Sequence, residues 1–420
     1  MTSPMKRILV LAASLPLAAA AQDKPAAPAV SLYGTLNVNF QTTKAEGATN
    51  PAQDVSSRMA VSTDSSNIGV RGSAGLLHDL KATFQCETSA ALDGIGAAGI
   101  CGRNSRIGLE SPWGTLWYGN WDTPFKASAY GTKADDPFQN TDVFGYQSIM
   151  GSPGFNYRSS AWKIATTTPI GGFDVRASNS VGYWSPKYEG VSLKAQYSAS
   201  EFKSAGPGQP TPGLIPELWS AVVNYDNYGF SVFAAYDRHD HASALNVANA
   251  AAGGAFGSTA ANPATLPSQD TAWRVGAGYQ LDTEAGATTL GASFEMLKLE
   301  QERAPTGAIT KYERQAFQVA LKHRYGDHEL RARYSSADKG TCSLAGGAAC
   351  STSNYAAQMI AVGYAYHLGK NTQAYLYYGQ IMNEDSAQYT FTIGGAPAVA
   401  GATPRGADPQ ALALGIRHAF

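Results

Sequence analysis

The sequence has 420 residues and a formal net charge of −1 at neutral pH, so it lacks the basic excess of a nucleic-acid-binding protein. Hydrophobic residues make up 44% of the chain, but 44 glycines and 22 tyrosines are spread among them. This composition favours many strands with one apolar face each over a solid globular core. Because no composition shift or linker divides the chain, we do not expect several soluble domains.

The first residues have the pattern of a leader. Lys6 and Arg7 precede an apolar run, and small alanines follow at 19–21. This order is typical of an export signal peptide, which we place at 1–21, followed by a short N-terminal segment at 22–29. Loss of Lys6 and Arg7 with the leader would change the net charge from −1 to about −3. After the leader, the sequence contains no run of about 18 apolar residues, so we expect no transmembrane helix.

From residue 30 onward, alternation of apolar and polar residues predicts about sixteen strands. In the first strand, 30–40, Leu32 and Phe40 share one face while Asn37 and Asn39 share the other. The connections are alternately short and long. We expect short turns at 75–78, 111–113, 186–189, 227–228, 282–285, 326–327 and 369–370. We expect long segments at 41–64, 89–101, 122–173, 201–217, 238–269, 300–310, 338–354 and 382–408.

The last strand alternates in the same way. Leu412, Leu414 and Ile416 share a face, and we assign the final aromatic residue, Phe420, as a terminal assembly signal. Short turns at one rim and long loops at the other predict an all-β fold, a 16-stranded antiparallel transmembrane β-barrel over 30–420 with short periplasmic turns and long outer loops. Pairing of the first strand with the last would leave no edge unpaired in lipid.

A β-sandwich is the alternative fold, because it would bury the apolar strand faces equally well. Aromatic residues at strand ends favour the barrel, since such residues form girdles at the two membrane interfaces. The residues that we assign to these girdles are Trp117, Tyr118, Trp121, Trp219, Tyr225 and Tyr236.

The four cysteines fall into two local pairs, Cys86 with Cys101 and Cys342 with Cys350. In an oxidising export compartment, such pairs predict two disulfides that staple loops. Zinc binding is the alternative, but neither pair has CxxC spacing or a histidine between its members.

Cations recur on the strand faces that would point into the lumen, where they would make one wall of the channel positive. The pore-lining basic residues that we predict are Arg71, Arg106, Arg176, Lys194, Arg274, Arg314, Lys322, Arg324, Arg331, Arg333 and Arg417. Each of them taken singly is equally compatible with an ordinary solvated face.

The segment 122–173 is exceptionally long and aromatic, so we expect it to fold inward as the third outer loop and to narrow the pore. Its aromatic residues include Phe125, Phe138 and Phe144, and its acidic residues are Asp122, Asp135, Asp136 and Asp142. Carboxylates opposite the arginines would create a transverse field that orients dipolar solutes and disfavours apolar ones. Permeation of this kind needs no covalent step.

Catalytic motifs are weak or missing. Residues 94–99 match the GxGxxG spacing, but they lie in a loop with no helix after them. Because no GxSxG, HExxH, P-loop or EF-hand pattern is present, we expect no enzyme activity, no cofactor and no metal site. Two other classes remain as alternatives, a barrel enzyme that uses His367 at a strand rim and a structural adhesin barrel with a plugged lumen.

Six segments carry a family resemblance: SLYGTLNVNF at 31–40, SSNIGVRGSAGLLHDLKATFQCE at 65–87, GRNSRIGLESPWGTLWYGNWDTPF at 102–125, DDPF at 135–138, RASNSVGYWSPKYEGVSLKAQYS at 176–198, and the closing GIRHAF. In this order they resemble the trimeric general-diffusion porins of Gram-negative outer membranes, β-proteobacterial type. The resemblance implies a homotrimer in outer-membrane lipid, inserted by the barrel-assembly machinery through its last strand. It also implies an inward third loop and passive diffusion of ions and small hydrophilic solutes.

The resemblance also implies roles for single residues. The wall cations are Arg71, Arg106 and Arg176, and the acidic loop matches at Asp135, Asp136 and Phe138. Two features depart from the family pattern. Asn67 and Asn120 stand where many relatives have arginine, and the segment 159–172 extends the third loop. Because of these departures, a substrate-selective channel of the same fold is the nearest alternative.

Overall fold

The computed structural model describes residues 28–94, 99–130, 132–133, 136–138, 141, 143–155, 172–199, 216–241, 244–247, 256–259, 267–302, 304, 306–347, 349–391 and 403–420. The signal peptide expected at 1–21 lies outside these residues, as does most of the segment 22–29.

Strands dominate the described chain. They are β1 (Ala29–Glu46), β2 (Val55–Thr63), β3 (Asn67–Gly75), β4 (Lys81–Ser89), β5 (Ser105–Ser111), β6 (Gly114–Asp122), β7 (Arg176–Trp184), β8 (Val191–Ala199), β9 (Glu217–Asn227), β10 (Phe230–Asp240), β11 (Ala244–Val247), β12 (Phe256–Thr259), β13 (Ser268–Thr283), β14 (Gly286–Gln301), β15 (Ile309–Tyr325), β16 (His328–Ala337), β17 (Thr341–Leu344), β18 (Ala357–Gly369), β19 (Thr372–Asn383) and β20 (Asp408–Ala419). The helices are α1 (Pro124–Ala127) and the 3-10 turns η1 (Pro51–Gln53) and η2 (Tyr146–Ser148). Of the helices in these ranges, none is long and apolar enough to cross a membrane.

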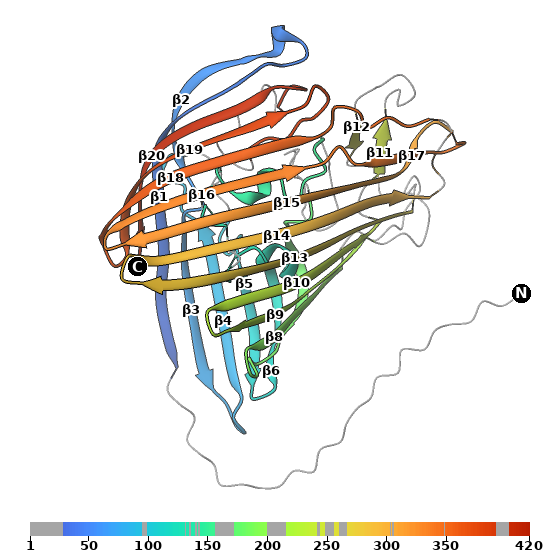
Figure 1. Cartoon of the computed structure of the whole chain (residues 1–420). Helices are drawn as coiled ribbons and strands as arrows, with labels where there is room; N and C mark the ends of the chain where they lie inside the picture. The colour runs from blue at the N-terminus through green and yellow to red at the C-terminus, as the bar shows by residue number, and fades with distance from the viewer. Residues whose placement is uncertain are drawn as a thin grey trace, which may run out of the picture.

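Among the described residues, 16 strands close into one antiparallel barrel, which confirms the predicted fold class (Figure 1). The barrel runs in chain order through β1, β3 to β10, β13 to β16 and β18 to β20. β1 closes it by pairing with β3 along one part of its length and with β20 along most of the rest. The remaining strands extend the outer rim: β2 pairs with β1, β17 with β15, and β11 with β12.

Side chains alternate between the two faces of the barrel as the sequence predicts. In β20, Leu412, Leu414 and Ile416 are 44%, 61% and 51% exposed on the outer face, whereas Ala411 and Ala413 are buried on the inner face. Apolar side chains that are exposed on the outside of a closed barrel are suited to contact with lipid, because no water surrounds them there.

The predicted short turns are all present at one rim. At the turn between β9 and β10, Tyr228 and Gly229 have φ angles of 48° and 81°, the left-handed pair that a two-residue hairpin favours. The prediction of a loop throughout 41–64 is wrong, since β1 continues to Glu46 and β2 returns from Val55. The sequence does not predict this hairpin, because β2 is exposed on both faces and therefore lacks an alternation of apolar and polar residues.

Both predicted disulfides are confirmed: Cys86 is bonded to Cys101, and Cys342 to Cys350. The first bond joins β4 to the loop that follows it, across a separation of 15 residues. Closing a loop of that length stabilises a fold by about 3 kcal/mol in the chain-entropy account.

We therefore expect the double variant Cys86→Ser/Cys101→Ser to fold as a barrel but to unfold at a lower urea concentration, by an amount equivalent to about 3 kcal/mol. Urea titration of the refolded protein measures this. The wild-type protein under a reducing agent, which also opens the Cys342–Cys350 bond, should unfold at the midpoint of the variant or below it. An unchanged midpoint in both would show that the loop gains nothing from the bond.

Candidate functional site in the barrel lumen

The segment that follows β6 folds into the barrel, as predicted for the third outer loop. It leaves β6 at Asp122, and the Phe125 N–H then donates a hydrogen bond to Oγ of Ser220 on β9 (3.0 Å). Further along, Phe138 contacts Tyr377 on β19. Because β9 and β19 lie far apart in the strand order of the barrel, the loop crosses the lumen.

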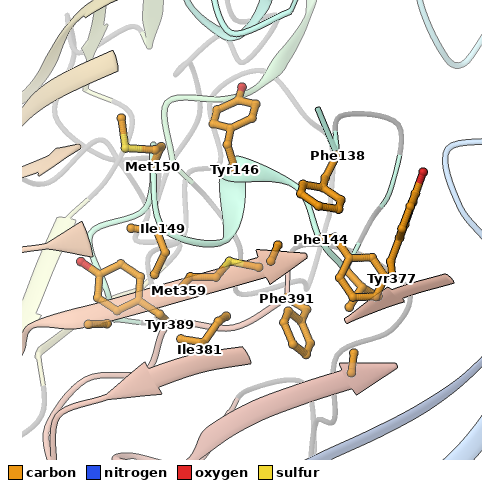
Figure 2. Close-up of a cluster of buried hydrophobic side chains, with 14 of the residues drawn as sticks. Phe138, Phe144, Tyr146, Ile149, Met150, Met359, Tyr377, Ile381, Tyr389 and Phe391 are labelled. Carbon is orange, nitrogen blue, oxygen red and sulfur yellow. The ribbon is translucent and has the colours of Figure 1, made fainter. Parts of the chain in front are cut away.

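A hydrophobic cluster fixes the loop to the wall (Figure 2). The rings of Phe138 and Phe144 both meet the ring of Tyr377 edge to face, at centroid distances of 5.3 and 5.8 Å. Gly379 leaves room for this contact, because a Cβ there would lie 2.8 Å from the Phe144 ring. The cluster is completed by side chains that include Tyr146, Ile149, Met150, Met359, Ile381, Tyr389 and Phe391. The core of this protein therefore lies inside its barrel.

Buried ion pairs also hold the same loop against the barrel wall. Asp136 of the loop contacts Arg333 of β16 at 2.5 Å, and both side chains are fully buried. The Asp136 carboxylate also accepts hydrogen bonds from the N–H groups of Phe138 and Tyr146. The carboxylate therefore holds the turn of the loop as well as the wall.

Glu295 of β14 is the centre of a larger network. It contacts Arg274 at 2.5 Å and Arg314 at 3.0 Å, and it accepts a hydrogen bond from the Gly151 N–H of the loop (2.7 Å). Arg274 also binds Asp174, at the end of the loop, at 2.9 Å. Two arginines of the wall and two carboxylates thus hold both the middle and the end of the loop.

Burial is the dominant electrostatic effect on the loop carboxylates. It raises the pKa of Asp136 above its ordinary value, against the opposing effect of the Arg333 guanidinium. Burial also raises the pKa of Asp174, which the Arg274 guanidinium opposes in the same way. Each carboxylate therefore depends on its arginine to stay ionised at this depth.

The long segment after β19 also contacts the third loop. The Gln388 N–H donates to the Gly154 carbonyl (2.9 Å), and a Cβ on Gly154 would lie 2.4 Å from the ring of Tyr389. Tyr389 and Phe391 are both fully buried. This second inward segment is not predictable from the sequence, because nothing in its composition pairs it with the third loop.

A polar cavity of about 280 Å³ remains between the tip of the third loop and the wall. Lys133 and Pro137 line it from the loop, and Lys322, Arg331 and Arg417 line it from β15, β16 and β20. Glu329 is also in the lining, and it pairs with Arg331 at 2.6 Å. The space is therefore suited to water and charged solutes.

A model of the Gram-negative porin family matches residues 8–386 of this sequence. The chain belongs to that family. The major outer membrane protein P.IB of Neisseria lactamica is 25% identical to this porin over 425 aligned residues, covering 99% of this chain and 100% of that protein. The porin thus forms a channel in the outer membrane of a Gram-negative bacterium.

Solved structures share the fold of this porin. An anion-selective porin from Comamonas acidovorans superposes with a TM-score of 0.67 at 20% identity, covering 94% of this chain and all of that one. The outer membrane protein OmpT of Vibrio cholerae, in its trimer form, superposes with a TM-score of 0.59 at 17% identity, with coverage of 94% and 100%.

All eleven predicted cations of the porin lie on the lumen parity of their strands, but the structure separates them into groups. Side chains that are at least partly exposed belong to Arg71, Arg106, Arg176, Lys194, Lys322, Arg324, Arg331 and Arg417. Of these, Arg176 contacts Asp122 at 3.2 Å and Arg324 lies beside the turn at Gly326.

Arg274, Arg314 and Arg333 are corrections to the predicted pore lining. Their side chains are 0%, 1% and 3% exposed, because the third loop covers them. Arg314 illustrates the reason: it donates to the backbone carbonyls of Ile149 and Ser152 as well as pairing with Glu295. These cations hold the loop and do not face the channel.

The acidic residues are distributed differently from the prediction. Asp122 is the last residue of β6 and contacts Lys126 and Arg176, so it lies at the base of the loop. Asp136 is buried against Arg333, although it is among the residues that line the polar cavity. Asp135 and Asp142 lie outside the described residues, as does nearly all of the loop extension 159–172.

Two of the predicted girdle aromatics are also wrong. Tyr118 and Trp219 are exposed on the outer face, but Trp117 is fully buried on the inner face. The ring of Trp121 lies beside it at 5.9 Å, following an irregularity in register between Gly119 and Trp121. These tryptophans belong to the lumen.

Proposed function

We propose that this porin is a water-filled channel for passive diffusion of ions and small hydrophilic solutes, without a catalytic step. The polar cavity beside the third loop supports this function, since Lys322 and Arg417 line it without a carboxylate at ion-pair distance among the described residues. An excess of lumen cations without partners favours anions. The similar fold from Comamonas acidovorans is itself described as anion-selective.

We further propose that three copies assemble, as in the trimer form of OmpT, and that the porin sits in outer-membrane lipid. The strand β20, with Phe420 after it, is the segment that we assign to recognition by the barrel-assembly machinery. His367 was the one candidate for barrel enzyme chemistry, and it pairs with Glu329 at 3.2 Å. The histidine therefore has a carboxylate as its partner, and that pair does not include a nucleophile.

The test is single-channel conductance of the purified porin in a planar bilayer, with the reversal potential measured across a potassium chloride gradient. We expect current steps in groups of three and a reversal potential that indicates chloride preference. The double variant Lys322→Gln/Arg417→Gln should shift the reversal potential toward zero, because it removes two lumen cations. Arg324→Gln, which removes an exposed charge at the turn rim, is the matched control.

A substrate-selective channel of the same fold is the second candidate, because the third loop and the segment around Tyr389 fill the lumen together. A very small conductance that one class of solute interrupts would favour that candidate. A folded porin with no current under any condition would instead favour a structural barrel and would contradict both channels.

A further inference from the structure

Three tryptophans lie together on the lumen wall. Trp117 and Trp121 come from β6 and Trp184 from the end of β7, and their ring centroids are 5.2 to 5.9 Å apart. The rings of Trp121 and Trp184 meet at 63°, edge to face. We call these three residues the tryptophan cluster. Such a group on the wet side of a barrel strand is unusual, because lumen positions of a channel are normally polar.

Glycines on the neighbouring strands leave room for Trp117. A Cβ on Gly182 would lie 2.1 Å from the Trp117 ring, so only glycine fits there. Gly108, the partner of Trp117 on β5, has the same role, since its Cβ would lie 3.0 Å from the Trp117 Cβ and 2.8 Å from the Arg106 guanidinium. Glycines on both neighbouring strands thus leave the space that the cluster occupies.

Two cations border the tryptophan cluster. The Arg106 guanidinium lies 4.5 Å from the Trp184 ring centroid and 5.5 Å from that of Trp121, and it donates a hydrogen bond to Oγ1 of Thr83 at 2.9 Å. Lys194 of β8 is the register partner of Trp184. No carboxylate of the described residues lies at ion-pair distance from Arg106 or Lys194.

Part of the site is accessible to solvent. Trp121, Trp184, Arg106 and Lys194 all keep partial exposure, while Trp117 is buried behind them. Because Asp122, the first residue of the loop, follows Trp121 directly, the cluster lies just below the base of the loop.

A ligand that satisfies all of these features needs a flat apolar ring and a negative charge. Indole faces attract aromatic rings by offset or edge-to-face contact, and a guanidinium beside them supplies a charge-assisted partner for a carboxylate. An uncharged sugar would use the rings but not the cations, and a simple inorganic anion would use the cations but not the rings.

We propose that the tryptophan cluster with Arg106 and Lys194 is a binding site for small aromatic carboxylates on the channel wall. The proposal rests on the proposed channel function for its route of access, but binding itself does not require current. Close packing alone would account for Trp117. It does not account for two partly exposed cations, with no carboxylate of the described residues at ion-pair distance, beside the two partly exposed rings.

Equilibrium binding tests the site directly. Sodium benzoate is titrated into the detergent-solubilised porin, with acetate and glucose as comparison probes, and binding is followed by calorimetry against a detergent blank. We expect benzoate to bind at least about tenfold more tightly than acetate, because only benzoate gains the ring contact. In the bilayer, benzoate should interrupt the current at concentrations at which acetate does not.

Two variants place the site. Trp184→Ala and Arg106→Gln should each weaken benzoate binding about five- to tenfold. Arg71→Gln is the matched control, since Arg71 is a lumen cation over the Tyr33 ring, at 4.9 Å, away from the tryptophans. It should leave benzoate binding within about twofold of wild type. Heat-modified gel mobility confirms that each variant folds.

Three results would overturn the proposal. Equal binding of acetate and benzoate would reduce the site to a plain anion site, and tighter binding of glucose would make it a sugar site. Unchanged benzoate binding in the folded Trp184→Ala variant would show that benzoate binds at another place. A porin that binds benzoate with no channel current would retain this proposal and contradict the proposed function instead.

Discussion

The Glu295→Ala variant of this porin is expected to give a larger and noisier single-channel current than wild type and to unfold at a lower urea concentration. Among the residues that the structure describes, Glu295 is the carboxylate that contacts Arg314, and it also accepts the Gly151 N–H of the third loop. Removing it leaves the Arg314 guanidinium buried without a counterion, which costs about 3–5 kcal/mol. Arg314 also holds the loop through the carbonyls of Ile149 and Ser152, so we expect loss of this network to release the loop and widen the lumen.

Conductance and urea titration measure the two effects together. Glu110→Ala is the matched control, because Glu110 also pairs with a lumen cation, Lys81 at 3.0 Å, but both side chains are half exposed. That exposed pair contributes about 1 kcal/mol or less. Equal behaviour of Glu110→Ala and Glu295→Ala would mean that the buried network does not hold the loop.

Phe144→Ala should loosen the same loop from its other side. The Phe144 ring is fully buried and meets the ring of Tyr377 at 5.8 Å, over the space that Gly379 leaves. Truncating a buried phenylalanine lowers the free energy of unfolding by about 3–5 kcal/mol, because the ring loses its contacts and a cavity is left behind. We expect current fluctuations between the wild-type level and a higher one.

The control for this variant is Phe294→Ala. Phe294 is 43% exposed on the outer face of β14, where its ring faces lipid and not the loop. Its truncation should leave the single-channel current unchanged. A steady wild-type current from Phe144→Ala would show that the ion pairs alone are sufficient to position the loop.

Alternation and turn residues were sufficient to predict the barrel, because both are local properties of a strand. The alternation along β20 and the two-residue turn at Tyr228 follow from residues that are adjacent in sequence. The same alternation placed Arg274, Arg314 and Arg333 correctly on the inner face.

The alternation of residues along a strand does not predict which inner side chains are covered by a segment that is distant in the sequence. Whether Arg333 faces water or Asp136 depends on where a loop about 200 residues earlier folds, and strand parity carries no information about that. The roles of Glu295 and Asp174 are hidden from the sequence for the same reason, because both depend on Arg274, which is distant from them in the chain. Glu295 did carry one signal, a carboxylate on the lumen parity between the outward Phe294 and Met296.

The tryptophans were misplaced for a different reason. Trp117 and Tyr118 are consecutive residues of one strand, so they point to opposite faces and cannot both belong to a lipid-facing girdle. Aromatic residue type therefore does not identify a girdle position unless the strand parity agrees with it. For Trp121, parity itself is unreliable, because the register of β6 shifts after Gly119.

The pairing of β1 with β20 has a consequence for how the molecule forms. Thr35 pairs with Ala419, so the contact that shuts the ring joins residues at opposite ends of the barrel sequence, whereas every other seam joins strands that are close in the chain. Such a long-range contact is the slowest to form, because the whole intervening chain must be ordered before it brings a gain. Until then, β1 and β20 are two open edges, and this interval is when a folding porin is most exposed to pairing with a neighbour.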